Sequence, residues 1–242
     1  MGGLSLTNAT VAGRLHNLSL KVMPGEVWGL IGPNGSGKSS LLHTLAGLLP
    51  STGRLRLGDQ DLHAMPARER ARQVGLLPQH NHSAWSLNVH DLVSLGRLPW
   101  LDEDPDAIDH AMELAGVRAF AHMRVDHLSG GQQARVWLAR VFAGCPQVLL
   151  ADEPVASLDL LYQQQISQAL RNYARQGKAV VVALHDLSLA ARCCDRLALM
   201  DQGRLIASGL VSQVLDPDLL SRVYGLEVMV DLASSPPIVL AR

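Results

Sequence analysis

A glycine-rich segment directly after an apolar run constrains the fold of this 242-residue chain more than any other feature. It matches the pattern Gly-x-x-x-x-Gly-Lys-Ser/Thr with the residues Gly32, Pro33, Asn34, Gly35, Ser36, Gly37, Lys38 and Ser39. The segment follows a predicted buried strand at 27–31 and precedes residues 38–49, whose apolar side chains repeat at helical spacing. A strand, a glycine-rich turn and a helix in this order predict a phosphate-binding loop in an α/β fold.

Each residue type in this loop suits the binding of phosphate. Glycines allow the backbone N–H groups to curl around an anion, and the following helix points its positive end at the same place. We expect Lys38 to contact the β- and γ-phosphates of a nucleoside triphosphate. The Ser39 hydroxyl is placed to bind Mg²⁺, and Ser40 is included among the predicted nucleotide-binding residues.

An apolar run at 148–151 ends in two carboxylates, Asp152 and Glu153. The side chains of neighbouring strand residues point to opposite faces, so the two carboxylates can have different roles. We expect Asp152 to hold Mg²⁺ and Glu153 to polarise an attacking water as the general base. The alternative is that the two carboxylates are simply solvated at the end of a strand. The phosphate loop upstream favours the catalytic interpretation.

The chain alternates between predicted strands and helices, with one helical interruption. Alternating strand patterns occupy 4–12 and 18–23, and buried strands are expected at 75–78, 147–152 and 179–184, with a helix at 160–176. The region 80–145 shows helical patterns at 88–96, 106–116 and 130–144 and little strand signal. We therefore expect one domain over 1–242, in which a mainly parallel core (1–79 and 146–242) is interrupted by a helical subdomain (80–145).

The composition of the chain argues against several classes of protein. The formal net charge is −1, which argues against bulk electrostatic binding of nucleic acid. No apolar run approaches the roughly 18–20 residues of a membrane span, and the start of the chain does not resemble a signal peptide. The 3 cysteines show no metal-binding or disulfide spacing, so we interpret them as thiols in a reducing cytosol.

Two adjacent glycines further along the chain predict a second anion-binding site. It lies in the segment Leu128-Ser129-Gly130-Gly131-Gln132, where Ser129 can cap a helix that begins near residue 130. The order of motifs resembles the ATP-binding-cassette family over essentially the whole chain. In that family this pentapeptide is the signature, and it contacts the γ-phosphate of ATP bound to the other cassette. The resemblance implies a RecA-like core with an N-terminal antiparallel β portion, and a head-to-tail dimer around two ATP molecules.

Three further positions match the family in the expected order. Gln79 resembles the Q-loop glutamine, which implies a role in catalysis and as a ligand of Mg²⁺. The segment 157–159 resembles the D-loop and includes Asp159, and His185 resembles the switch histidine that contacts the γ-phosphate. The resemblance implies that Glu153, His185 and Gln79 act together on ATP. It also implies a membrane permease as partner and, indirectly, a periplasmic or extracellular substrate-binding protein.

One position departs from the family pattern. The segment 11–16 contains no aromatic ring to stack on adenine. The guanidinium of Arg14 or the ring of His16 can take this place, or both can be ordinary loop residues. Nucleotide discrimination is therefore predicted to be weak.

The branch of the family is indicated by residues 86–100 and by the tail at 209–228, which resemble importers of iron–siderophores, haem or cobalamin. These features predict an ATPase on the cytoplasmic face of a bacterial plasma membrane. The alternatives are the ATPase of an exporter and a soluble cassette protein without a transport role. Trp85 has two interpretations, as a core residue of the insertion or as part of a groove that receives a permease helix.

Overall fold

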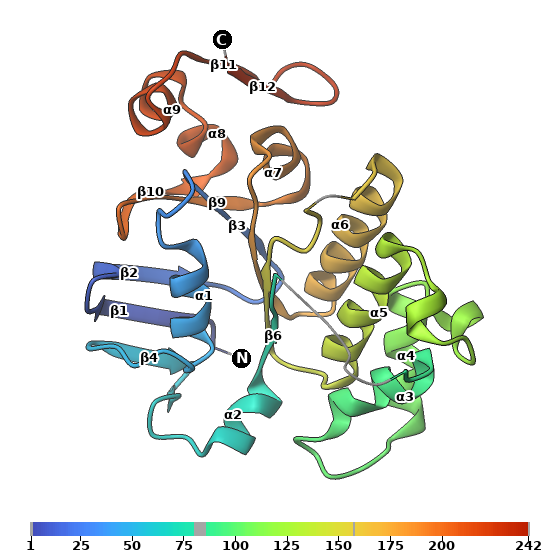
Figure 1. Ribbon diagram of the computed structural model, residues 1–242. Coiled ribbons are helices and arrows are strands. Elements are labelled where there is room, and N and C mark those ends of the chain that lie inside the picture. Colours follow the sequence, from blue (N-terminus) through green and yellow to red (C-terminus); the bar gives the residue numbers. More distant parts are fainter. Residues whose placement is uncertain (1, 80–85, 157, 242) are drawn as a thin grey trace.

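The computed structural model describes residues 2–79, 86–156 and 158–241 (Figure 1). The strands are β1 (Leu4–Val11), β2 (Leu15–Val22), β3 (Val27–Ile31), β4 (Arg54–Leu57), β5 (Gln60–Asp61), β6 (Val74–Leu77), β7 (Val148–Asp152), β8 (Ala179–Ala183), β9 (Arg196–Asp201), β10 (Arg204–Leu210), β11 (Val228–Asp231) and β12 (Ile238–Ala241). The α-helices are α1 (Lys38–Leu45), α2 (Ala67–Gln73), α3 (Val89–Ser94), α4 (Pro105–Leu114), α5 (Gly130–Ala143), α6 (Leu160–Arg175), α7 (Leu187–Cys193), α8 (Val211–Val214) and α9 (Pro217–Tyr224). Short 3₁₀ turns are η1 (Leu95–Arg97), η2 (Arg118–Phe120) and η3 (Val125–His127).

The central sheet has the strand order β10-β9-β3-β8-β7-β6, and only β10 pairs antiparallel to its neighbour. Every residue of β3, β7 and β8 is buried, because helices or a second sheet cover both faces. The continuous apolar runs in the sequence reflect this burial on two sides. The predicted mainly parallel α/β sheet is therefore confirmed.

A smaller antiparallel sheet covers one face of the central sheet. Its order is β2-β1-β4-β5, and Figure 1 shows β1, β2 and β4 lying beside α1. The second strand begins at Leu15, three residues earlier than the alternation at 18–23 predicts, because Val11 and Leu15 pair across a tight turn. Side chains from both sheets and from α1 form one core, which includes Leu6, Trp28, Leu42, Leu150 and Val181.

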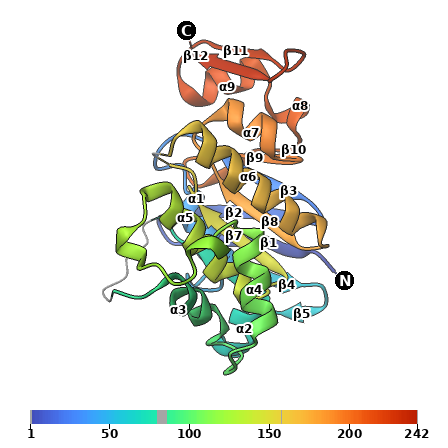
Figure 2. The same ribbon diagram turned by 90° about the vertical axis from the view of Figure 1, so that its right-hand side faces the viewer.

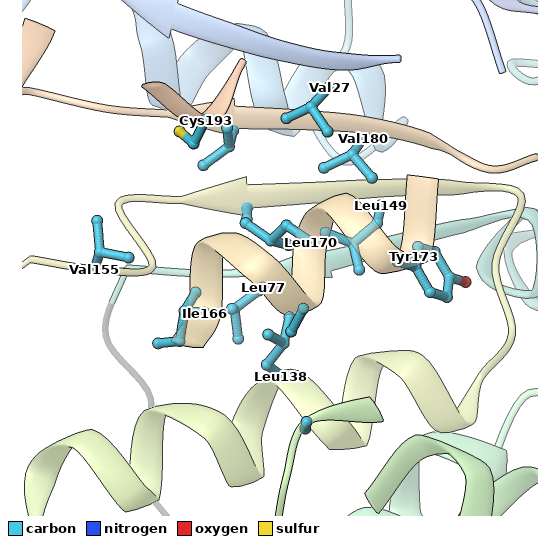
Figure 3. Close-up of a cluster of buried hydrophobic side chains, with 14 of the residues drawn as sticks. Val27, Leu77, Leu138, Leu149, Val155, Ile166, Leu170, Tyr173, Val180 and Cys193 are labelled. Carbon is cyan, nitrogen blue, oxygen red and sulfur yellow. The ribbon is translucent and has the colours of Figure 1, made fainter. Parts of the chain in front are cut away.

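A second core lies on the opposite face of the central sheet. Figure 3 shows Ile166, Leu170 and Tyr173 of α6 between the sheet residues Leu149 and Val180 and the α5 residue Leu138. Alternate residues of a strand point to opposite faces, so Leu149 faces this core while Leu150 faces the other. The sheet is thus held between two separate apolar layers.

The region 86–143 contributes helices to the second core. Figures 1 and 2 show α3, α4 and α5 grouped together, with α5 next to α6. Within the described part of 80–145, pairing between strands is limited to one isolated bridge, Asn88 with Arg124. Capping residues fix the starts of these helices. Asn88 caps α3, and Asp104 caps α4, whose first residue is Pro105.

Several predicted boundaries were wrong. Helix α1 ends at Leu45 rather than at residue 49, because Gly47 adopts a left-handed conformation with φ of 67° and Leu48 is exposed. The helix expected at 88–96 ends at Ser94 and continues as the 3₁₀ turn η1. The elements after residue 187 have no counterpart among the strands and helices predicted from the pattern. In the described residues, no helix combines the length and apolar character that a bilayer span requires.

Candidate active site

The phosphate loop joins the C-terminal end of β3 to α1, as the sequence predicts. Gly32, Gly35 and Gly37 have φ values of 142°, 77° and 103°, which glycine adopts without steric strain. A Cβ atom on Gly32 would lie 2.1 Å from the carbonyl oxygen of Met200 on β9. The loop therefore needs glycine both for its backbone conformation and for its close approach to the neighbouring strand.

Lys38 and Ser36 place polar groups inside the loop. The Lys38 ammonium donates to the carbonyl oxygens of Gly32 at 2.7 Å and Pro33 at 3.0 Å. Burial lowers the pKa of Lys38 below its usual value, while the charges of Glu153 and Asp152 oppose this shift. The Ser36 hydroxyl is buried and has no hydrogen-bond partner among the described residues. Both side chains suit an anion in the loop.

Asp152 and Glu153 differ in their backbone position. The prediction that both belong to the strand was wrong, because β7 ends at Asp152 and Glu153 follows it with a φ of 50°. A residue with a side chain seldom adopts this left-handed conformation outside a constrained turn. Asp152 is 3% exposed, and its Oδ1 atom has no hydrogen-bond partner among the described residues.

The Glu153 carboxylate lies between two side chains that are distant in sequence. The Gln79 amide nitrogen donates to Glu153 Oε2 at 2.7 Å, and His185 Nε2 contacts Glu153 Oε1 in a short hydrogen bond. Gln79 follows β6, Glu153 follows β7 and His185 follows β8, so all three lie at the carboxyl edge of neighbouring parallel strands. The structure thus brings together the three predicted catalytic residues, at the edge where parallel sheets bind ligands.

The donor set fits Mg²⁺ that is bound together with a nucleotide. Within the described residues, no group of three or more His, Cys, Asp and Glu side chains could hold a metal ion. Mg²⁺ is usually held by one or two protein carboxylates together with phosphate oxygens, and the unpaired Asp152 oxygen suits this arrangement. Gln79 turns its amide nitrogen toward Glu153, which leaves the amide oxygen as its possible metal ligand. Ser39, the remaining predicted ligand, is half-buried on the first turn of α1.

The signature segment begins α5. The Ser129 hydroxyl accepts from the Gln132 backbone N–H at 3.4 Å, and the Gln132 side-chain oxygen accepts from the Ser129 N–H at 2.9 Å. Gln132 therefore closes the cap of its own helix, whereas the family resemblance predicts that it binds nucleotide. A pocket of about 180 Å³ has Gly130, Gln79 and Glu153 in its lining.

Two other predicted positions have clear local roles. Asp159 is exposed and caps α6, where its carboxylate accepts from the Tyr162 N–H at 3.0 Å. Ser40 lies on α1 and its carbonyl oxygen accepts from the Thr44 hydroxyl at 2.8 Å. The D-loop residue Ser157 lies outside the described residues, as do Trp85 and the rest of 80–85.

A turn between β9 and β10 contributes to the site, although it was not among the residues predicted from the sequence. The Gly203 N–H donates to the Ser36 carbonyl oxygen in the phosphate loop, and the Gly203 carbonyl accepts from the His16 N–H, both at 2.9 Å. The φ of Gly203 is 74°, and a Cβ atom there would lie 2.3 Å from the Arg14 oxygen. The sequence Asp-Gln-Gly marks a turn, but nothing local indicates that this turn meets the phosphate loop.

The segment 11–16 runs beside the phosphate loop. His16 belongs to strand β2, so the interpretation of this residue as part of a loop was wrong. Arg14 lies in the turn before it, and its exposed guanidinium has no hydrogen bond or ion pair within the described residues. A Cβ atom on Gly37 would lie 3.4 Å from the Arg14 carbonyl oxygen, which places this turn next to the loop.

We expect ATP and GTP to be hydrolysed with similar efficiency. If the Arg14 guanidinium stacks on the base, Arg14→Ala raises the Kd of ATP about two- to fivefold, in line with an exposed cation–π contact. His16→Ala is the matched test of the alternative ring. Titration with a fluorescent ATP analogue, with GTP as competitor, measures both effects. A strong preference for ATP that survives both substitutions contradicts this interpretation of the segment.

Comparison with protein families matches residues 15–156 to the model described as ABC transporter. The chain belongs to the ABC transporter family. It is therefore an ATPase of that family, as the motif order predicts. The matched range includes the phosphate loop, Gln79, the signature segment and Glu153.

Two relatives of high similarity carry the same name. The chain is 43% identical over 225 residues to the hemin import ATP-binding protein HmuV of Pseudomonas entomophila (strain L48), covering 89% of this chain and 88% of the relative. It is 45% identical over 217 residues to the protein of the same name from Rhodococcus jostii (strain RHA1), covering 87% and 74%. The ABC importer branch predicted from the sequence includes these relatives.

Solved structures share the fold. A chain of a metal-chelate type ABC transporter in an inward-facing conformation superimposes with a TM-score of 0.84 at 22% identity, covering 96% of this chain and 92% of that one. The cbiO1 protein of Clostridium perfringens, part of the ABC transporter complex cbiONQ, gives a TM-score of 0.80 at 26% identity, covering 90% and 92%.

Proposed function

We propose that this chain is the ATP-hydrolysing subunit of a hemin importer, and that two copies drive a membrane permease. The observation that carries the hydrolytic part is the Glu153 carboxylate, which Gln79 and His185 hold at the strand edge beside the phosphate loop. The similarity to the hemin import ATP-binding proteins supports the choice of hemin over the siderophores and cobalamin that the sequence left open.

The site residues have distinct roles in the proposed reaction. The backbone of 32–37, with Lys38, holds the β- and γ-phosphates. Ser39, Gln79 and Asp152 would hold Mg²⁺, which offsets the negative charge of the phosphate oxygens. Glu153 takes a proton from the attacking water as it approaches the γ-phosphate. His185 orients the Glu153 carboxylate, which its ring nitrogen contacts.

A second copy completes each nucleotide site in this proposal. The start of α5 presents the backbone N–H groups of Gly130 and Gly131, and the positive end of the helix favours an anion there. A Cβ atom on Gly130 would meet no atom within 4 Å, so this residue is open to an incoming group. Asp159 is exposed at the start of α6. We assign both helix starts to the surface that meets the ATP bound to the second copy.

A groove between β6 and the helical subdomain is the proposed docking site of the permease. It has a volume of about 350 Å³, and Gly75, Leu98, Pro99, Trp137 and Val141 belong to its lining. Leu98 is 58% exposed, so the groove offers an apolar side chain that a permease helix can cover.

Hydrogen bonds and a cation–π contact hold the rim of this groove. The guanidinium groups of Arg68 and Arg72 donate to the Pro99 carbonyl oxygen at 2.8 and 2.9 Å. The Trp100 indole N–H donates to the Gly144 carbonyl oxygen at 2.9 Å, and its ring lies under the Arg72 guanidinium. A rim held by these contacts can pass movement of the helical subdomain to a docked permease helix. Docking there would place the subunit on the cytoplasmic face of the membrane, with a substrate-binding protein on the other side.

The substrate is tested by ATP hydrolysis in the assembled transporter. We expect hemin, presented by its binding protein to the permease complex in lipid vesicles, to raise the ATPase rate severalfold, because transport and hydrolysis are coupled. A ferric siderophore and cobalamin are the matched comparisons. Stimulation by either of these instead of hemin contradicts the substrate assignment, and failure of this chain to copurify with any membrane protein contradicts the transport role.

A further inference from the structure

The start of α6 meets the start of α5 through the side chain of Tyr162. A Cβ atom on Gly131 would lie 2.3 Å from two carbon atoms of the Tyr162 ring. The ring therefore covers the Cα of Gly131, and no larger residue fits at that position without a shift. Gly130, the neighbouring glycine of the signature segment, has no such contact. Of the two glycines, only Gly131 is constrained by packing inside its own subunit.

Two further contacts hold the ring in place. The Ser129 hydroxyl donates to the Tyr162 hydroxyl oxygen at 3.4 Å, a long and weak hydrogen bond. The Arg135 guanidinium lies 5.3 Å from the centre of the ring, within the range of a cation–π contact. Arg135 is anchored in turn, because its guanidinium donates to the Gly116 carbonyl oxygen at 3.0 Å. The ring is thus fixed between α5 and α6.

The backbone of Tyr162 contacts Asp159, the other residue that is predicted to lie at the dimer interface. Its N–H donates to the Asp159 carboxylate, which caps α6. A glutamine in the first turn of each helix holds the loop before that helix. Gln133 donates to the Leu128 carbonyl oxygen, and Gln163 donates to the Leu158 carbonyl oxygen. Each helix start is therefore held by its own hydrogen bonds, and the contacts of Tyr162 in the described residues include both starts.

We infer that Tyr162 is a positioning residue that sets the spacing between Asp159 and the signature segment, so that one subunit presents both to a second copy as a single surface. The inference rests on the proposed ATP-bound dimer. Within the described residues, no hydrogen bond or ring contact joins Tyr162 to the phosphate loop or to Gln79, Glu153 and His185. Its substitution is therefore expected to leave ATP binding by one subunit intact and to weaken closure of the dimer.

The test uses full-length protein that also carries Glu153→Gln, which slows hydrolysis and allows the ATP-bound dimer to accumulate. Sedimentation measures the dimer Kd with ATP, and a fluorescent nucleotide measures ATP affinity at subunit concentrations below that Kd. We expect Tyr162→Ala to raise the dimer Kd about tenfold or more, in the range of a truncated interface aromatic, with ATP affinity unchanged. Tyr162→Phe keeps the ring on Gly131 and is expected to stay within about threefold of the parent.

Two controls separate the possible outcomes. Gln164→Ala changes an exposed residue of the same helix and is expected to leave the dimer Kd unchanged. If the parent with Glu153→Gln does not dimerise with ATP, the proposed function fails. If the parent dimerises and Tyr162→Ala dimerises equally well, the proposed function stands and the role of Tyr162 is overturned.

Thermal melts test the contact itself and do not depend on nucleotide. Gly131→Ala is expected to lower the melting temperature by roughly 2–10 °C, because its Cβ overlaps the ring. Gly130→Ala is the matched control, whose added Cβ meets open space. Adding Tyr162→Ala to Gly131→Ala is expected to restore part of the loss. Equal melts for the two glycine variants would show that the ring does not constrain Gly131, and the inference would be overturned even if Tyr162→Ala alone misfolds.

Discussion

Replacement of Glu153 by glutamine is expected to lower kcat for ATP hydrolysis by about 100-fold or more, because the general base is lost. The substitution keeps the size of the side chain and removes the negative charge that Gln79 and His185 contact. Asp152 and Lys38 are unchanged, so binding of ATP with Mg²⁺ is expected to remain. Release of phosphate under saturating ATP measures the first effect, and nucleotide titration measures the second.

Glu26→Gln is the matched control for this prediction. Glu26 directly precedes β3, so it lies at the amino ends of the parallel strands, opposite the carboxyl ends that carry Glu153. Its carboxylate forms an ion pair with Arg196 at 2.9 Å. Both side chains are partly exposed, so loss of the pair is expected to cost at most about 1 kcal/mol of stability and to leave kcat within about twofold. A Glu153→Gln variant that hydrolyses ATP at a near-normal rate contradicts the assignment of the general base.

Replacement of Lys38 by alanine is expected to weaken ATP binding itself, by about 10- to 150-fold in Kd. This range corresponds to the loss of hydrogen bonds from a charged group, about 1.5–3 kcal/mol. The substitution also leaves the carbonyl oxygens of Gly32 and Pro33 without the ammonium that holds them. Equilibrium titration with a fluorescent ATP analogue, performed without hydrolysis, measures the change.

Lys21→Ala controls for a general effect of charge, since Lys21 is an exposed lysine on β2. We expect its ATP affinity to equal that of the parent protein. An unchanged Kd in Lys38→Ala would show that the phosphates bind elsewhere. A circular dichroism spectrum of each variant separates a lost contact from a lost fold.

The phosphate loop and the signature segment were predictable because their conformations are encoded locally. Glycines at 32, 35 and 37 provide the backbone angles, and β3 and α1 on either side follow from apolar patterns. Ser129 caps α5 as the sequence predicts, whereas the return hydrogen bond from Gln132 was not predicted. The predicted strand at 147–152 has the same end as β7, but the left-handed conformation of Glu153 was not predictable, because no glycine marks it.

The position of the proposed catalytic group was predictable only through family resemblance. Gln79 and Glu153 are 74 residues apart in sequence, and Glu153 and His185 are 32 apart. Nothing in the local pattern of any of the three indicates a contact. They meet because β6, β7 and β8 are neighbours in the sheet, and the order of strands is a property of the whole fold.

The α/β class, the family and the residues that can bind phosphate follow from motifs whose chemistry and backbone conformation are local. The assembled fold sets which distant groups touch. It placed the Gly203 turn against Ser36 and the Tyr162 ring on Gly131, two contacts for which the sequence carries no periodic signal. The physical reason is that close packing selects such pairs by shape after the sheet and helices have assembled, whereas caps, turns and strands are selected residue by residue along the chain.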